Sequence, residues 1–172
     1  MAQLNGDGIQ LWAKGIMHQN EFRSAVLYAR NLSIVWGSDG RYWKWERISN
    51  PISSEDLEVA KLIEVCWLQI DGKCRDQNLA KGVTYGVYFI VKLEENHSIT
   101  RPVTLKLTCP NGDTQENKVD LKQQPKKELI GLKVGEFTGS GTNKFIRFSF
   151  NGREGTSWKT GLTCFGAVIV PI

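Results

Sequence analysis

The feature that most constrains the fold is the alternation of apolar and polar residues along several short segments. Residues 83–93 and 102–109 both carry an apolar side chain at every second position. Successive side chains of a β-strand point to opposite faces, so each segment predicts a strand with one face in a core. The residues predicted to face inward are Tyr85, Val87, Phe89, Val91 and Leu93 in the first segment, and Val103, Leu105, Leu107 and Cys109 in the second.

Other segments extend this pattern into a complete fold. Residues 130–134 and 145–150 alternate as well, and the nearly continuous apolar run 162–170 predicts a central strand. Most of the 17 glycines lie between these runs; Asn111-Gly112 predicts a hairpin and Asp71-Gly72 a turn. About eight strands with little helix predict an all-β protein, a two-sheet antiparallel β-sandwich of jelly-roll type.

Three segments do not follow this simple pattern. Residues 1–25 lack periodicity and predict an N-terminal extension, which leaves 26–172 as the single folded domain. The stretch 59–70 is ambiguous: its first half allows a helix capped by Ser54, whereas its second half favours a buried strand. Residues 111–128 are polar and rich in lysine, which predicts a long exposed loop.

Charge and hydropathy exclude some classes of protein. The net charge is +4, from 22 basic and 18 acidic residues, which permits weak binding to an anionic polymer without requiring it. No apolar run approaches the ~20 residues of a membrane-spanning helix. The first twelve residues show no basic start followed by an apolar block, so we expect no secretory signal peptide.

The four cysteines are widely spaced and form no close pair. Structural zinc sites use closely spaced ligand pairs and the chain has only two histidines, so we expect no metal and no cofactor. We expect Cys66, Cys109 and Cys164 to be buried and Cys74 to be exposed in a charged turn. Lys73 and Arg75 would then favour the Cys74 thiolate, although internal pairing of all four cysteines in a secreted fold remains an alternative.

Motifs of enzymes are missing from the sequence. It contains no GxSxG, no P-loop and no HExxH. Residues 94–97 place two glutamates beside a histidine, but on a predicted loop without a nucleophile. We therefore expect a protein that is not an enzyme.

The stretch 36–45 is the richest in candidate binding residues, with three tryptophans, a tyrosine, an acid and two bases around a tight turn. Alternation places Trp43 and Trp45 opposite Tyr42 and Lys44, so the core cannot take every ring. An exposed ring beside charges suits stacking of a sugar or of a nucleic-acid base. We expect Trp43 to be the stacking platform, with Trp36 stacking beside it or supporting it; ordinary core packing is the alternative.

Five blocks of this sequence resemble the phloem protein 2 lectins, also called Nictaba-type lectins, and the short cucurbit members in particular. The blocks, in family order, are YARNLSIVWGSDGRYWKW at 28–45, VAKLIEVCWLQIDGK at 59–73, residues 85–93, LKVGEF at 132–137 and SWKTGLTCFGAVIVPI at 157–172. The resemblance thus covers residues 28–172.

This resemblance implies a plant lectin for N-acetylglucosamine oligomers, such as chitin fragments and the core of N-glycans on glycoproteins. It implies a homodimer without metal, located in the cytoplasm, nucleus or phloem sap. Some members of the family bind RNA or form disulfide-linked filaments with a partner phloem protein. The turn at 38–41 departs from other members, which often carry proline there.

The expected carbohydrate-binding residues combine the motif with its charged neighbours. The resemblance assigns Trp36, Trp43 and Glu136, and the stretch 36–46 and the C-terminal block add Asp39, Arg41, Lys44, Trp45, Glu46, Trp158 and Lys159. The alternative function is an RNA-binding or structural phloem filament protein with a minor sugar site. For RNA, the candidate contacts are Lys118, Lys122, Lys126 and Lys127.

Overall fold

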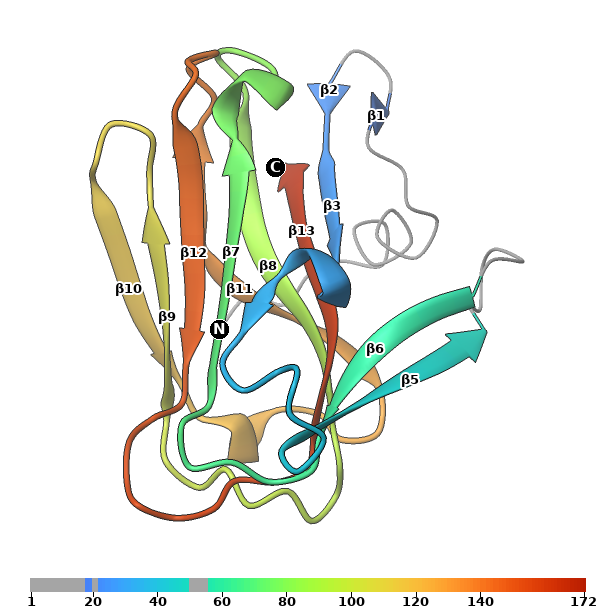
Figure 1. Ribbon diagram of the computed structural model, residues 1–172. Coiled ribbons are helices and arrows are strands. Elements are labelled where there is room, and N and C mark those ends of the chain that lie inside the picture. The colour runs from blue at the N-terminus through green and yellow to red at the C-terminus, as the bar shows by residue number, and fades with distance from the viewer. Residues whose placement is uncertain (1–17, 20–21, 50–55) are drawn as a thin grey trace.

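The computed structural model describes residues 18–19, 22–49 and 56–172, and its main body is a sandwich of two antiparallel sheets (Figure 1). The five-stranded sheet contains, in spatial order, β10 (Thr114–Val119), β9 (Val103–Thr108), β12 (Phe145–Asn151), β7 (Gln69–Arg75) and β4 (Ser33–Ile34). The six-stranded sheet contains β11 (Leu129–Thr138), β8 (Thr84–Leu93), β13 (Leu162–Pro171), β6 (Asp56–Leu62) and β5 (Trp43–Ser49), with β3 (Ala25–Tyr28) also paired to β13. The predicted all-β sandwich is confirmed.

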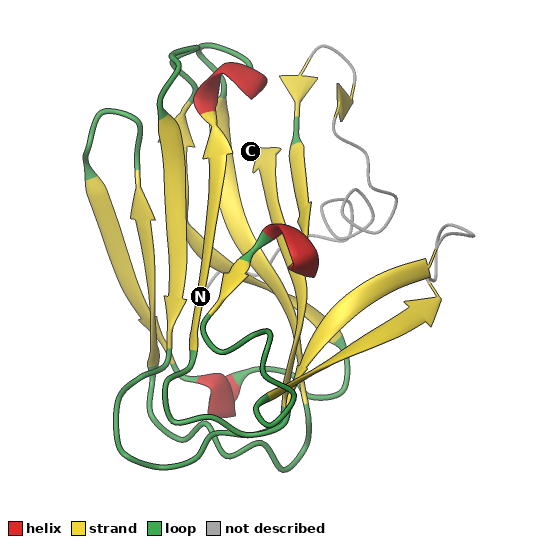
Figure 2. Ribbon diagram, in the orientation of Figure 1, coloured by secondary structure: helices red, strands yellow, loops and turns green. Residues whose placement is uncertain are grey.

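Little helix is present in the described residues. Three short 3-10 helices connect strands: η1 (Ala29–Asn31), η2 (Asp76–Asn78) and η3 (Leu121–Gln123) (Figure 2). None of the helices in this part of the chain is long and apolar enough to cross a membrane.

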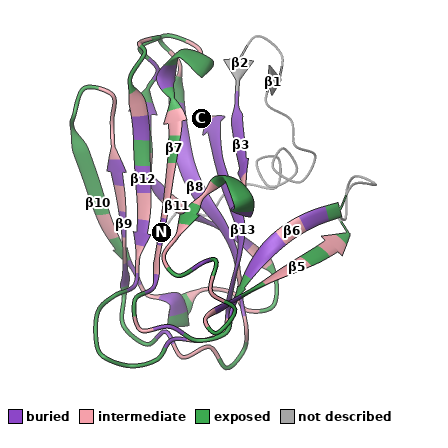
Figure 3. Cartoon of the chain, in the orientation of Figure 1, coloured by how far each residue is buried: buried purple, intermediate pink, exposed green. Residues whose placement is uncertain are grey.

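The core lies between the two sheets and is built from the alternating faces that the sequence predicts. Figure 3 shows buried residues alternating with intermediate or exposed ones along β9 and β12. Phe89 on β8 packs edge-on against Phe148 and Phe150 of the facing sheet, with ring centroids 5.4 and 5.9 Å away. Strand β13 pairs with β8 along one side and with β3 and β6 along the other, which confirms the central C-terminal strand.

The helix considered for the first half of 59–70, with its cap at Ser54, is wrong, because residues 56–62 form strand β6, paired with β5. Both faces of this strand are covered: Leu62 packs in the core between the sheets, and Val59 packs in a second apolar cluster, each at most 3% exposed. Apolar residues on both faces of a strand imitate helical spacing. The strand predicted for the second half starts later, since β7 begins at Gln69.

The turn predicted at Asp71-Gly72 is also wrong, because both residues lie inside β7. Gly72 is required there for packing: a Cβ at this position would lie 2.4 Å from the ring of Phe148 on β12. By contrast, the Asn111-Gly112 hairpin is confirmed, with Gly112 at φ +93° between β9 and β10. The long loop predicted for 111–128 instead contains β10 and η3, and β10 escaped prediction because an edge strand exposes most of its side chains.

The predicted N-terminal extension, residues 1–25, lies mostly outside the described residues. Within the described part, β1 (His18–Gln19) pairs with β2 (Phe22–Arg23) as a short hairpin. Strand β3 already belongs to the six-stranded sheet, and Ala25 at its start is 2% exposed.

Three of the four cysteines differ from expectation in their burial. All four thiols are free, and burial raises the pKa of Cys164 to about 12. Cys66 and Cys109, predicted to be buried, are only partly buried. Cys74, predicted to be exposed and reactive, points inward from β7 against the core, and burial together with the nearby Asp76 carboxylate raises its pKa to about 11. Lys73 and Arg75 lie on the opposite, exposed face of the strand, so their charges do not indicate that Cys74 is exposed.

We therefore predict that Cys74 is alkylated slowly in the native protein. At pH 8, only about a thousandth of a thiol with this pKa is ionised to the thiolate, whereas about a quarter of an ordinary cysteine thiol is ionised. Iodoacetamide labelling, mapped by mass spectrometry, should be roughly 100-fold slower at Cys74 in native than in denatured protein. Fast native labelling at this position would contradict the inward orientation.

Candidate carbohydrate-binding site

The predicted binding residues gather at one end of the sandwich, where three loops meet at the lower edge of Figure 1. These loops are residues 35–42, 63–68 and 152–161, which precede β5, β7 and β13. Backbone hydrogen bonds join them: Ile63 N donates to Tyr42 O at 2.8 Å, and Val65 and Lys159 exchange bonds of 3.1 and 2.8 Å. Loops that are far apart in the sequence are thus joined by backbone hydrogen bonds at one end of the sandwich.

Trp36 is turned outward by an unusual backbone conformation. Its φ angle is +62°, and a bulky side chain rarely adopts this left-handed region. Gly37 N donates to Ile34 O at 2.9 Å and closes the turn. The turn is too tight for a side chain at Gly37, because a Cβ there would lie 2.9 Å from the same oxygen. The Trp36 side chain is 56% exposed as a result. Strain of this kind concentrates at functional sites.

Three rings form a continuous aromatic row: Trp36, Tyr42 and Trp158. The centroids of Trp36 and Tyr42 are 5.9 Å apart, and those of Tyr42 and Trp158 are 6.3 Å apart with only 16° between the ring planes. Trp158 is 52% exposed, and its backbone oxygen accepts a 3.1 Å hydrogen bond from the Ser98 hydroxyl. An exposed row of fixed rings suits the apolar faces of consecutive sugar rings.

A charged pair lies beside this row. Arg41 donates from Nε and Nη2 to the two carboxylate oxygens of Asp39, at 3.1 and 2.8 Å, and its guanidinium lies 5.2 Å from the Tyr42 centroid. Hydrogen bonds from the Arg41 side chain and backbone lower the pKa of Asp39 to about 2. At neutral pH the pair therefore offers both an anionic acceptor and a fork of donors to sugar hydroxyls.

Trp43 does not have the role that its motif suggests. It is 2% exposed and packs in the core between the sheets, with its indole Nε1 donating to Val35 O at 3.2 Å. No face of the ring is open to a sugar, so the expectation of Trp43 as stacking platform is corrected. The hydrogen bond instead holds the turn that presents Trp36.

Trp45 holds the same turn from the next inward position of β5. Its Nε1 donates to Gly37 O at 2.7 Å, and the Arg30 guanidinium covers the ring at 3.6 Å. The neighbouring Lys44 and Glu46 lie on the other face of the strand and pair at 3.2 Å.

Comparison with known proteins identifies the family of this chain. Residues 23–171 match the family described as Phloem protein 2. The chain belongs to the phloem protein 2 family. It is 40% identical over 152 residues to Protein PHLOEM PROTEIN 2-LIKE A1 of Arabidopsis thaliana, covering 85% of this chain and 61% of that protein. It is 38% identical over 149 residues to a lectin of Luffa acutangula, covering 85% of this chain and 69% of that one.

Similarity to solved structures is weaker. A Podospora anserina GH26-CBM35 mannanase superimposes with a TM-score of 0.49 at 8% identity, covering 90% of this chain and 28% of the mannanase.

The chain spans only part of the length of its sequence relatives. It covers 36% of a second Arabidopsis thaliana relative, Protein PHLOEM PROTEIN 2-LIKE A5.

Lys159 of this phloem protein 2 domain stabilises a loop and does not line the edge of the binding site. It is 3% exposed, and its ammonium donates to Cys66 O at 2.7 Å and to Ser157 O at 3.1 Å. Burial lowers the pKa of Lys159, although its ammonium donates hydrogen bonds to the two carbonyl oxygens. The predicted rim role of Lys159 is thus corrected, and its bonds fix the loop that carries Trp158.

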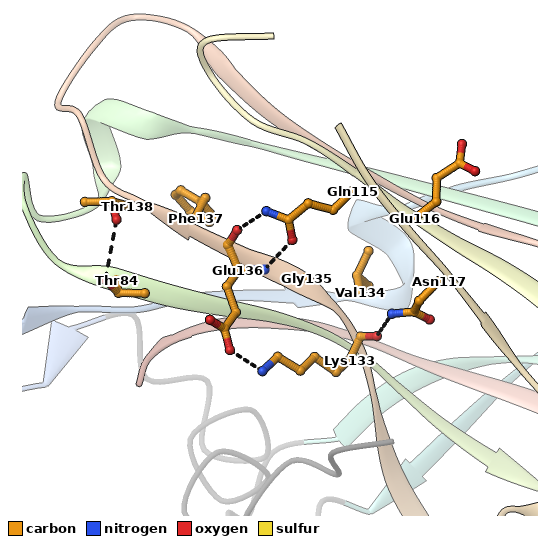
Figure 4. Close-up of a pocket in the computed structure, with 10 residues that line it drawn as sticks. All are labelled: Thr84, Gln115, Glu116, Asn117, Lys133, Val134, Gly135, Glu136, Phe137 and Thr138. Atoms are coloured by element: carbon orange, nitrogen blue, oxygen red, sulfur yellow. Dashed lines mark hydrogen bonds and ion pairs between the residues drawn. The ribbon is translucent and has the colours of Figure 1, made fainter. Parts of the chain in front are cut away.

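Glu136 lies far from the aromatic row. It is on β11, at the opposite edge of the six-stranded sheet from β5. Figure 4 shows it in a separate hollow of about 520 Å³, where the Gln115 amide pairs with the backbone of Glu136 and Lys133 forms an ion pair with its carboxylate. The fold therefore does not bring Glu136 together with the tryptophans.

One ring of the row is absent from the predicted binding residues: Tyr42, which is the central ring. Trp67, predicted within a buried strand, is 47% exposed in a loop outside the row. Arg153 lies 4.7 Å from its ring, and its Nε1 donates to Gln69 Oε1 at 2.9 Å. Within the described residues, no group of three His, Cys, Asp or Glu side chains is placed to hold a metal ion.

Proposed function

We propose that this protein is a lectin that binds N-acetylglucosamine oligomers, including chitin fragments and the core of N-glycans, on the aromatic row. The observation that carries the proposal is the row itself, because Trp36 and Trp158 expose more than half of their surface side by side with Tyr42. A soluble fold does not place three adjoining rings at its surface for stability alone. The relatives called lectins support the sugar-binding class, and the family resemblance supports the sugar.

In the proposed complex, the three rings and the Asp39–Arg41 pair contact different parts of the sugar. The C–H faces of the sugars stack on Trp36, Tyr42 and Trp158, while the Asp39 carboxylate and Arg41 guanidinium exchange hydrogen bonds with hydroxyl and amide groups. Adjacent centroids are 5.9 and 6.3 Å apart, so the row accepts more than one sugar residue. An oligomer therefore binds more tightly than a single N-acetylglucosamine.

In this proposal the protein acts by binding, without catalysis. It functions as a homodimer in the cytoplasm, the nucleus or phloem sap. A filament partner linked through Cys74 is not part of the proposal, because that thiol points inward.

RNA binding through the lysine-rich segment 118–127 is the second candidate, and its contacts are partly engaged already. Lys126 Nζ donates to the backbone oxygens of Leu121, Lys122 and Gln124, and Lys118 lies 3.8 Å from Glu154. We therefore rank sugar binding first.

A glycan array tests the proposal against this alternative. We expect chitin oligomers and N-glycans with an exposed core to give the strongest signals, almost unchanged between 0.05 and 0.5 M NaCl, since stacking involves no ion release. An array without signal from N-acetylglucosamine oligomers, together with RNA binding that falls steeply with salt, would overturn the order of the two functions.

A further inference from the structure

The outer face of the five-stranded sheet carries an unusual basic cluster, defined by Lys73, Arg75, Phe145 and Arg147. The Arg75 and Arg147 guanidinium carbons lie 4.5 and 5.2 Å from the centre of the Phe145 ring, and the Lys73 ammonium lies 4.9 Å from it. All three cations are exposed. They belong to neither the aromatic row nor the hollow at Glu136.

The cluster follows directly from strand register. Phe145 on β12 is paired with Arg75 on β7, and Arg147 with Lys73. The intervening residues Ile146 and Cys74 point into the core, so the four cluster residues share the outer face.

The three cations have no acidic partner among the described residues. None of the ion pairs in this part of the chain includes them, and Arg75 donates instead to the neutral Asn143 amide oxygen at 2.7 Å. Three like charges around one ring repel one another, because their separation is within a Debye length of ~8–10 Å. Bound anionic groups would relieve this repulsion.

A shallow hollow of about 270 Å³ adjoins the cluster, and its lining indicates the chemistry of the anion. Arg147 and Lys106 line it together with the hydroxyls of Thr108 and Ser149 and the carboxylate of Asp71. Hydroxyls and a carboxylate accept hydrogen bonds from sugar hydroxyls, and the carboxylate would repel a dense row of phosphates. The lining therefore favours a sugar chain with one acidic group per residue over a nucleic acid.

We propose that this face, formed by β7, β12 and β9, is a binding site for acidic polysaccharides built of uronic acids. The carboxylates of the polymer pair with Lys73, Arg75 and Arg147, and its hydroxyls bind in the hollow beside Ser149. The site is independent of the aromatic row, which lies on the loops at one end of the sandwich, so one molecule holds a neutral and an acidic glycan together.

Calorimetric titration of the full chain with a galacturonic acid pentamer tests the proposal. We expect the wild type to bind the pentamer and not its methyl-esterified form, and the double variant Lys73→Gln/Arg147→Gln to bind at least about tenfold more weakly. The matched control is Lys61→Gln, an exposed lysine on β6 of the other sheet, which should change the affinity less than about twofold. All three substituted positions are exposed, and circular dichroism checks that each variant is folded.

Three outcomes would overturn the proposal: no binding of the pentamer, equal binding by the double variant, or tighter binding of a single-stranded RNA of equal charge. The last result would assign the cluster to phosphate groups. Chitotriose binding, measured in parallel, should be the same in the wild type and the double variant; this separates failure here from failure of the proposed lectin function.

Discussion

Replacement of Trp158 by alanine is expected to weaken chitotriose binding by about 2 kcal/mol, roughly 30-fold, without destabilising the fold. The ring is 52% exposed and stacks on Tyr42 with a centroid distance of 6.3 Å. Removing it deletes one end of the row, whereas the backbone bonds of its loop to Ser98 and Val65 remain. Isothermal titration calorimetry measures the affinity, and thermal unfolding followed by circular dichroism measures the stability.

Trp67→Ala is the matched control for this variant. Trp67 is exposed to a similar degree, 47%, but its ring lies against Arg153 and it takes no part in the row. The control should bind chitotriose within about twofold of the wild type. If both variants lost affinity equally, the effect would reflect nonspecific binding to exposed aromatic rings. The assignment of the aromatic row as the sugar site would then be wrong.

Replacement of Trp43 by alanine is expected to have the opposite result, a large loss of stability. The side chain is 2% exposed in the core, and truncation of a buried tryptophan costs about 3–5 kcal/mol. Part of this cost is the lost hydrogen bond from Nε1 to Val35 O, which leaves a carbonyl without its partner. Urea unfolding monitored by circular dichroism gives the free energy of unfolding directly.

Trp43→Phe separates packing from hydrogen bonding at this position. The phenyl ring keeps most of the volume, so we expect a smaller loss of about 1–2 kcal/mol and a chitotriose affinity close to that of the wild type. A stable Trp43→Ala protein that had lost only its sugar binding would contradict the buried orientation and restore Trp43 as a contact residue.

The alternating strands were predictable because a strand with one covered face imposes a period of two on its sequence. β9 and β12 show this clearly, because the apolar residues at every second position pack in the core: Val103, Leu105 and Leu107 on β9, and Ile146, Phe148 and Phe150 on β12. The prediction failed where tertiary structure overrode the local pattern. Gly72 looked like a turn residue, yet it is a strand residue against which the Phe148 ring packs.

The site was only partly predictable, and Trp36 and Trp43 show why. Both belong to one aromatic motif, but a positive φ angle turns Trp36 outward while strand alternation directs Trp43 into the core. The sequence pattern indicates rings near a turn without indicating which ring faces the solvent. The approach of Trp158 to Tyr42 depends on the pairing of distant loops through Val65 and Lys159, which no local signal reveals.

Nitrogen–proton NMR of the indole groups can show whether a sugar stacks on Trp36 and Trp158. During titration of the wild type with chitotriose, we expect saturable shifts of the Trp36 and Trp158 indole signals, assigned by single Trp→Phe variants. The Trp67 signal should stay in place, because this ring lies outside the row. Saturable binding that left the Trp36 and Trp158 signals unmoved would contradict stacking on these two rings.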